Sequence, residues 1–308
     1  MSSSPVVRPE KKRRRSPKIR NPVAIKELRG RMRGRRAFVI LTIYLLIMSG
    51  LVLLIFGGFA ASGSTGLNQR LMGKYVFAVV VAVQIFLVLI IGPSLTAGAI
   101  SGEKERQTYD LLRTTLLSSR TIVAGKLLSA LSYVFLLVIA SIPIQSIAFF
   151  LGGISLSEVV ISQAVILVCA IAYSMIGLFL STVARNTLAA SVATYAIVIF
   201  LTAGLPVLAG GIAILTESIR YGPLGLGDLS QVFLNYLLLL LAGLNLPASL
   251  VVSDIFLLEN GSLFGYRDTI STYSVFMFSP WYLSILFYSL LALLLFSLTV
   301  RRVRRVSG

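Results

Sequence analysis

Long apolar runs dominate this chain and alternate with short segments that carry nearly all of its charge. A transmembrane helix needs about 20 consecutive apolar residues to cross ~30 Å of hydrocarbon. Six runs reach this length, so the pattern predicts six spans and an all-α polytopic membrane protein with a transmembrane domain over 37–300. The expected spans cover approximately 37–60, 75–100, 127–151, 157–183, 187–214 and 278–300.

A seventh apolar stretch, residues 229–257, is ambiguous because Asn245 and Pro247 interrupt it. With six spans, 24 of the 28 Lys and Arg residues lie on one side of the membrane and four on the other. Cytoplasmic loops of membrane proteins carry an excess of Lys and Arg. We therefore expect 229–257 to form re-entrant or interfacial helices on the outer face. Both termini are then cytoplasmic, and the plasma (inner) membrane is the expected location.

Composition supports a membrane protein and offers little for chemistry. Hydrophobic residues make up 56% of the chain and charged residues 13%, against roughly 25% charged residues in soluble domains. The chain has no histidine, and its single cysteine, Cys169, lies inside the fourth predicted span. This pattern gives no metal-ligand cluster and no disulfide framework. We expect no catalytic residue, no metal and no cofactor held by this chain.

The basic N-terminal region has two predicted parts. Residues 1–20 are rich in Ser, Pro, Lys and Arg and are expected to be a disordered cytoplasmic tail. Residues 21–36 are expected to form an amphipathic interface helix on a bilayer with anionic inner-leaflet lipids, and nucleic acid is not an expected partner. The apolar stripe of this helix comprises Ile25, Leu28 and Met32, and its polar residues include Lys26, Glu27 and Arg29. A second basic tail is expected at 301–308.

The segment between the second and third predicted spans, 101–126, is dense in charge. Its spacing predicts an amphipathic helix over 103–117, in which opposite charges three residues apart add roughly 0.2–0.5 kcal/mol per pair. Ser118 and Ser119 are expected to end this helix and to cap the next. The charged face comprises the pairs Glu103–Arg106 and Asp110–Arg113, and a second stripe comprises Tyr109, Leu112 and Leu116. The pattern fits either a protein docking surface or an interfacial membrane helix.

The sequence GEKERQTYDLLRTTLLSSRTIVAGK resembles the segment between spans two and three of type-2 permeases of ATP-binding-cassette (ABC) transporters. Those permeases usually carry E-K-E-x-G-T-x-E-L-L-x-x-T-P-L-S-x-x-x-I-x-x-G-K there. Three positions depart from the pattern: Gln107 (usually Gly), Asp110 (usually Glu) and Leu116 (usually Pro). Losing Gly and Pro predicts a more continuous helix. The segment NPVAIKELRGRMRGRR also resembles the entry helix of these permeases, and the whole similarity covers about 21–305. The matching positions are Glu103, Lys104, Glu105, Thr108, Leu111, Leu112, Thr115, Leu117, Ser118, Ile122, Gly125 and Lys126.

The resemblance implies a function for this helix. In such permeases it is a coupling helix that rests on a separate P-loop ATPase subunit. Two permease chains, identical or different, work with two ATPase chains, and export is the usual direction. The chain has no G-x-x-x-x-G-K-[ST] motif, so ATP would bind the partner subunit and this chain would not itself be an enzyme. The implied ATPase contacts are Glu103, Glu105, Arg106, Tyr109, Asp110, Leu112 and Arg113.

Two other functions remain open from the residues alone: an ion-coupled secondary transporter and a non-transporting membrane scaffold subunit. Ion-coupled transporters place ionisable groups near the bilayer midplane, whereas the predicted spans carry uncharged polar residues such as Gln84, Gln145 and Gln163. These residues suit a path for amphipathic or hydrophobic substrates, or hydrogen bonds between helices. The sequence names no substrate.

Overall fold

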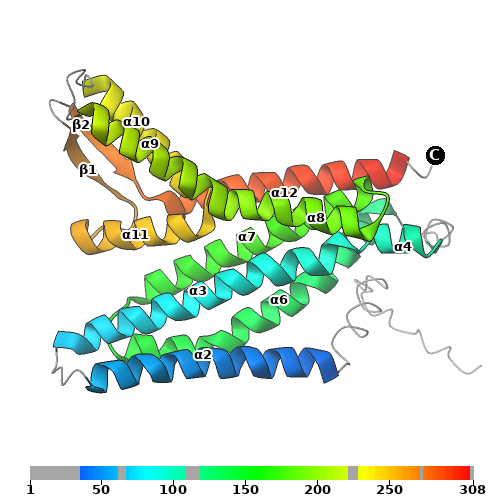
Figure 1. Ribbon diagram of the computed structural model, residues 1–308, viewed down its shortest axis with the longest axis horizontal. Helices are drawn as coiled ribbons and strands as arrows, with labels where there is room; N and C mark the ends of the chain where they lie inside the picture. Colours follow the sequence, from blue (N-terminus) through cyan, green and yellow to red (C-terminus); the bar gives the residue numbers. More distant parts are fainter. Residues whose placement is uncertain (1–34, 62–66, 109–117, 221–227, 271–272, 306–308) are drawn as a thin grey trace, which may run out of the picture.

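The structure, a computed structural model, describes residues 35–61, 67–108, 118–220, 228–270 and 273–305 (Figure 1). Within these residues, six helical segments are long and apolar enough to cross a membrane, as predicted. The spans are α2 (Arg35–Ala61), α3 (Leu67–Ala97), α6 (Ser119–Phe150), α7 (Leu156–Val183), the fifth span α8–η1–α9, and α12 (Pro280–Arg305). The fifth span consists of α8 (Thr187–Ile199), the π-helical turn η1 (Phe200–Gly204) and α9 (Leu205–Arg220).

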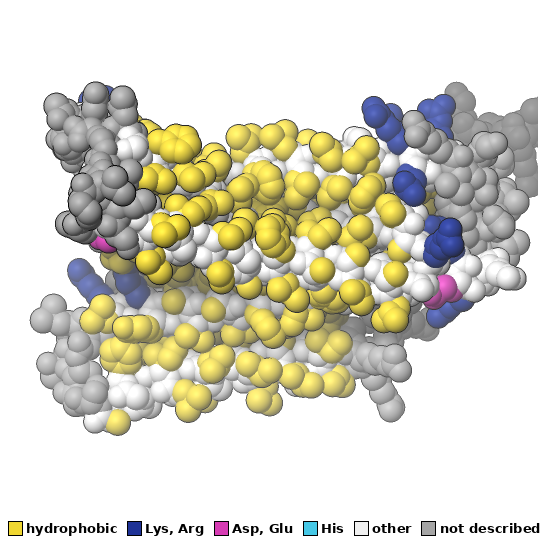
Figure 2. Space-filling view, turned by 45° about the horizontal axis from the view of Figure 1, so that its top comes forward, with side chains coloured by type: hydrophobic (Ala, Val, Ile, Leu, Met, Phe, Trp, Pro, Cys, Tyr) yellow, Lys and Arg dark blue, Asp and Glu magenta, His cyan; other side chains and the backbone are white. Residues whose placement is uncertain are grey.

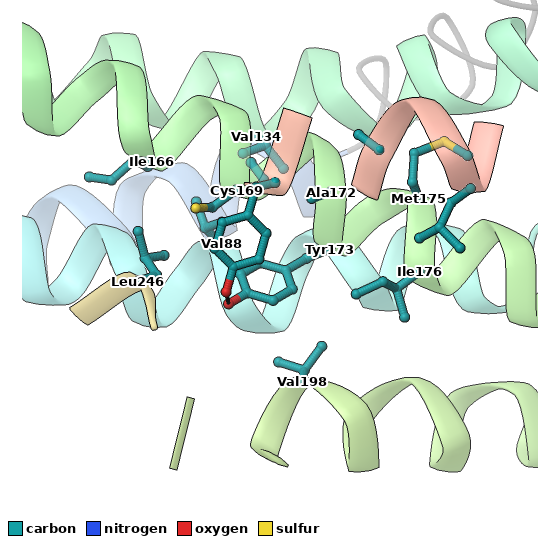
Figure 3. Packing of buried hydrophobic residues seen from close by; sticks show 14 of the residues in the cluster. Val88, Val134, Ile166, Cys169, Ala172, Tyr173, Met175, Ile176, Val198 and Leu246 are labelled. Carbon is teal, nitrogen blue, oxygen red and sulfur yellow. Dashed lines mark hydrogen bonds between the residues drawn. The ribbon is translucent and has the colours of Figure 1, made fainter. Parts of the chain in front are cut away.

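Helix α7 lies at the centre of the bundle. About 67% of its apolar window is buried, against 11–39% for the other five spans. Gly177 lets α3 approach closely, because a Cβ there would lie 2.4 Å from Thr96 Oγ1 and 3.2 Å from the Ala97 nitrogen. Small residues of this kind allow membrane helices to pack backbone to backbone. Figure 3 shows Cys169, Tyr173 and neighbouring α7 side chains packed against other helices.

The apolar stretch around Asn245 forms two helices that reverse direction. They are α10 (Asp228–Gly243) and α11 (Leu246–Asn260), and Asn245 at the break caps α11 by accepting a hydrogen bond from the Ala248 nitrogen at 2.8 Å. The far ends of both helices lie at the same end of the molecule (Figure 1). The sequence predicts a break at this residue, and the stretch is accordingly an antiparallel helix pair rather than one long helix.

Asn245 also binds the irregular turn of the fifth span. Its Nδ2 donates to the carbonyls of Leu201 and Thr202, at 2.8 and 3.0 Å. These carbonyls lie in η1, just before Pro206, which has no N–H with which to continue a helical ladder. One buried amide (1% exposed) therefore caps α11 and binds backbone groups that a π-turn and a proline leave free.

Side chains of α12 bind the carbonyls at the tip of the α10–α11 pair, and a tyrosine of α7 contacts one of them. Ser284 Oγ donates to the Gly243 carbonyl, and Tyr288 OH donates to the Leu244 carbonyl, each at 2.7 Å. The Tyr173 hydroxyl lies 2.9 Å from that of Tyr288, and both tyrosines are fully buried. Non-helical backbone is tolerated at membrane depth only where protein satisfies it in this way.

The described structure is largely helical, as predicted, and an antiparallel hairpin that the sequence analysis did not predict follows α11. Strands β1 (Gly265–Ile270) and β2 (Tyr273–Phe278) pair in a register that runs from Gly265↔Phe278 to Ile270↔Tyr273. The buried Met277 packs with Leu239 and Phe256 of the helix pair. The apolar residues of β2 resemble the start of a span, and the sequence therefore predicted a sixth span that begins at 278. In the structure, α12 begins at Pro280.

Helix ends also differ from the prediction. α3 starts at Leu67 rather than near 75, and α12 continues through the basic residues to Arg305 rather than ending before a tail at 301. Ser118 caps α6, as predicted: its Oγ accepts from the Thr121 nitrogen at 3.3 Å. The tail 1–20 lies outside the described residues, as do Lys26, Glu27 and Arg29 of the predicted interface helix.

Replacing Asn245 should destabilise the fold. Asn245→Ala removes the α11 cap and leaves two buried carbonyls unbound, which we expect to cost about 2 kcal/mol. Asn245→Ser keeps a capping oxygen but does not reach η1, so it should fall between wild type and alanine. Thermal unfolding of the detergent-solubilised protein measures the difference. The matched control is Asn186→Ala, which removes only the cap of α8; an equal loss in Asn186→Ala and Asn245→Ala would contradict the second role of Asn245.

Candidate functional site: the α4 junction

A short helix, α4 (Ser101–Glu105), lies beyond the end of α3 and contacts the adjoining ends of α6, α7 and α8. We call this set of contacts the α4 junction. It lies at the same end of the molecule as the C-terminus of α12 (Figure 1). Ser181 of α7 binds the start of α4, because its Oγ accepts from the backbone nitrogens of Ile100 at 2.8 Å and Ser101 at 2.9 Å.

Glu103 of α4 is paired with α6. Its Oε1 lies 2.7 Å from Lys126 Nζ, which also donates to the Ala99 carbonyl at 2.8 Å. The Lys126 side chain is 3% exposed and that of Glu103 24%. A charge buried to this degree is stable only when it is paired and hydrogen-bonded. The ion pair therefore fixes α4 against the first turns of α6.

Lys104 binds the end of α7. Its Nζ donates to the carbonyls of Thr182 at 2.7 Å and Ala184 at 3.3 Å. The last carbonyls of a helix have no partner within the helix and carry partial negative charge, which favours a nearby cation. Lys104 thus supplies both the hydrogen bonds and the charge that this helix end requires.

Glu105 binds the start of α8. Its Oε1 accepts from the Thr187 nitrogen and its Oε2 from Thr187 Oγ1, each at 2.7 Å. The first nitrogens of a helix carry partial positive charge, so a carboxylate is favourable there. Because α7 ends and α8 begins within a few residues, adjacent Lys104 and Glu105 match two helix ends of opposite polarity. Three consecutive charged residues therefore connect α4 to three different spans.

Within the described residues, the structure corrects the start of the predicted helix over 103–117. α4 ends at Glu105, and Gln107 adopts a left-handed conformation with φ of 56°. The Gln107 nitrogen donates to the Lys104 carbonyl at 3.1 Å, and the Thr108 nitrogen to the Glu103 carbonyl at 2.9 Å. This pair of bonds is the Schellman ending of a helix, which usually has Gly at the left-handed position. The prediction that Gln107 gives a more continuous helix is therefore wrong.

The predicted ion pair between Glu103 and Arg106 is also replaced, because Glu103 pairs with Lys126. Of the predicted ATPase contacts, Glu103 and Glu105 point to the spans, and Arg106 is exposed beside exposed Gln107 and Thr108. The remaining predicted contacts lie outside the described residues: Tyr109, Asp110, Leu112 and Arg113, with Leu116 of the same stripe.

Sequence reasoning did not assign a contact to Lys104, Lys126, Ser181 or Thr187. Lys104 and Lys126 match the permease pattern, but the spacing of the insert does not show what they bind. A signal was present for Lys126: it stands next to a long apolar run, where an ionisable residue requires a partner. Ser181 and Thr187 carry no such signal, because small hydroxyl residues are common in membrane helices.

The polar residues within the spans bind one another across helix interfaces. Gln84 of α3 donates through Nε2 to Ser141 of α6 and, at 3.4 Å, to Gln163 of α7. Its Oε1 accepts from Gln145 at 2.9 Å and from Gln163 at 3.1 Å. Gln84 and Gln145 are 2% and 1% exposed. Of the two interpretations of these residues, the structure supports hydrogen bonding between helices.

The six spans and the charged junction at their end define a multi-pass membrane protein of the permease type. The chain belongs to the ABC-2 transporter family: the model of the family described as ABC-2 family transporter protein matches residues 21–297. The resemblance to type-2 permeases of ABC transporters is therefore confirmed, and membership implies partnership with an ABC ATPase subunit. No curated protein matches the chain.

The Glu103–Lys126 pair should behave as a coupled unit. Glu103→Gln removes one counter-charge from the buried Lys126 ammonium, and we expect a loss of about 3 kcal/mol in the free energy of unfolding. In Glu103→Gln/Lys126→Gln no charge is left behind, so the loss should be smaller than the sum of the two single losses. A double-mutant cycle on thermal unfolding measures this coupling. Exposed Arg106→Gln is the control, and additive single effects would refute the pairing.

Gln107→Gly should stabilise the protein. Glycine takes the left-handed conformation without the Cβ clash, which we expect to contribute about 1 kcal/mol. Gln107→Ala removes the same side chain but keeps the clash and should give no gain. The comparison is made by thermal unfolding of both variants. A glycine variant no more stable than the alanine variant would show that residue 107 is not left-handed in solution.

Proposed function

We propose that this chain is the translocating permease subunit of an ABC exporter and that a separate ATPase subunit docks on the α4 junction. The observation that carries this proposal is the sequence Glu103-Lys104-Glu105, in which each residue binds a different span. A surface helix held by three spans cannot move alone. A displacement imposed on it would pass to all of them.

The route of this transmission follows from the central position of α7. The start of α4 is bound by Ser181, and Lys104 binds the end of the same helix, so α4 has two points of attachment to α7. The α7 side chains form much of the buried core. Packed cores move between discrete arrangements as rigid bodies rather than deforming continuously. An ATPase that closes on ATP would thereby shift the bundle between two states.

Charge supports an inward, cytoplasmic orientation of the junction. Figure 2 shows dark-blue Lys and Arg side chains gathered at the right end, where α4 and the C-terminus of α12 lie in Figure 1. Lys and Arg are enriched on the cytoplasmic side of membrane proteins. Described residues of this end include Lys104, Arg106, Lys126, Arg185, Arg301, Arg302 and Arg304.

The proposed working unit has two permease chains, identical or different, and two ATPase chains that bind the ATP. It resides in the plasma membrane, with anionic inner-leaflet lipids against the basic N-terminal region and both termini cytoplasmic. Tyr109, Asp110, Leu112 and Arg113 complete the docking surface, as the resemblance implies. Arg106 and Glu105 are its exposed described members, Glu105 also binds the start of α8, and the half-buried Glu103 binds α6.

Reversal of one exposed charge should weaken docking without unfolding the chain. Arg106→Glu should lower the amount of ATPase subunit that co-purifies with tagged protein about tenfold, because like-charge contacts at an interface oppose association. The matched control is Arg267→Glu, an exposed charge reversal on β1 at the opposite end. Thermal unfolding confirms that both variants are folded. An ATPase captured equally by both variants would refute docking at this surface, and no captured ATPase with wild type would favour a scaffold subunit.

A further inference from the structure

A groove lies between α3 and α11, away from the α4 junction. It encloses about 500 Å³, within the 300–1,000 Å³ that is usual for small-molecule sites. Along α3 its lining extends from Lys74 to Leu89. At 1.5 Å per residue this is about 22 Å, close to three quarters of the ~30 Å hydrocarbon core. The groove is therefore long enough for a hydrocarbon chain lying parallel to α3.

One end of this groove is charged. Lys74 of α3 and Asp254 of α11 face each other with 3.7 Å between Nζ and Oδ1, and their side chains are 26% and 45% exposed. The other lining residues are apolar, and α11 contributes Leu250 and Val251. Figure 2 shows a furrow between two apolar blocks with Lys and Arg side chains at its left end, the end of the β1–β2 hairpin in Figure 1. An apolar body with charges of both signs at one end is the surface that a zwitterionic amphiphile fits.

A second cavity of about 60 Å³ adjoins the charged end. It shares Asp254 with the groove and adds Glu158, Ser253 and Trp281. Glu158 Oε2 is buried and makes no hydrogen bond within the described part of the chain. Two carboxylates on one side and Lys74 on the other give the charged end a polarity. The cationic part of a headgroup would lie toward Asp254 and Glu158, and the anionic part toward Lys74.

Close backbone packing holds the charged end in place. A Cβ at Gly153 would lie 2.3 Å from the Arg70 carbonyl oxygen and 2.6 Å from the Lys74 nitrogen, so the α6–α7 loop lies directly on the first turns of α3. Ile154, the next residue, lines the groove. On the other wall, the contacts of Asn245 fix the start of α11. The site is thus preformed, which lowers the entropic cost of binding.

A second surface pocket, between α2 and α3, differs from the α3–α11 groove. It encloses about 420 Å³, and its lining comprises Leu54, Ile55, Gly58, Phe59, Tyr75 and Val79, none of which is charged. Any lipid chain can fill a pocket of this kind. The α3–α11 groove differs in carrying an ion pair whose partners are both accessible.

We propose that the α3–α11 groove binds one zwitterionic amphiphile drawn from the bilayer as cargo, with its chain along α3 and its headgroup between Lys74 and Asp254. The anionic group of the ligand binds the Lys74 ammonium, and its cationic group binds the Asp254 carboxylate. A headgroup of one charge would be attracted by one of these residues and repelled by the other. Transport of this ligand rests on the proposed function, whereas its binding in the groove does not.

The single tryptophan of the chain, Trp281, lines the adjoining cavity and reports on the site. Purified full-length protein, without ATPase, is titrated in a neutral maltoside detergent while the Trp281 emission is recorded. Four probes share one chain and differ in headgroup: hexadecylphosphocholine, hexadecyl phosphate, hexadecyltrimethylammonium and hexadecyl maltoside. We expect hexadecylphosphocholine to give a saturable change at a concentration at least about tenfold lower than the other three, because both charges contribute.

Two variants locate the binding. Ala82→Phe places a ring in the groove at an exposed lining position and should abolish the change, whereas Ala60→Phe at an exposed position on α2 should leave it intact. Lys74→Gln/Asp254→Asn should make the four probes bind alike. Equal binding of all probes to wild type, or unchanged binding to Ala82→Phe, would overturn the proposal, as would the absence of saturable binding to folded protein. Because no ATPase is present, these outcomes are independent of the capture of ATPase that tests the proposed function.

Discussion

Helix ends within a membrane protein must have their backbone groups bound by other parts of the chain, because lipid supplies no hydrogen bonds. The described structure meets this constraint at two places with side chains that reach across helices. At the α4 junction, Ser181, Lys104 and Glu105 bind the ends of α4, α7 and α8. At the tip of the α10–α11 pair, Asn245 and Tyr288 bind carbonyls of η1 and of the turn. The same contacts that satisfy the backbone also fix how the helices are arranged.

At the junction this has a mechanical consequence. A loop held only by apolar contacts could slide over the ends of the spans, whereas α4 is held by an ion pair and by two helix ends of opposite polarity. Each contact is directional, so we expect a displacement of α4 to be passed to α6, α7 and α8. Lys126 strengthens this attachment because it is almost fully buried, and separating it from Glu103 would take a counter-charge from a buried ammonium. These properties suit α4 to the role of force transmission that the proposed function gives it.

The hydrogen bonds that hold the α10–α11 pair also position one wall of the proposed ligand groove. Asn245 positions the first turn of α11, and Leu250, Val251 and Asp254 follow on that helix as one wall of the groove. The other wall is α3, which packs on α7 through Gly177 and ends at the junction. One helix, α3, therefore runs from the groove to α4. In the proposed function, α3 is therefore the element that connects the ligand groove to the docking surface.

The sequence by itself determined the membrane class, the six spans, the break at Asn245, the Ser118 cap and the family, because long apolar runs, helix breakers and a spaced motif are local signals. Only the tertiary structure decided what the charged residues bind. Spacing along one helix suggested that Glu103 pairs with Arg106, but the partner is Lys126, which is distant in sequence and brought near by the packing of α6. Local pattern also missed the end of α4 at Gln107 and the β1–β2 hairpin. The left-handed residue follows a short helix whose charged side chains bind other spans, and the strand pair packs on α10 and α11 through Met277. Periodicity along the chain does not encode these contacts.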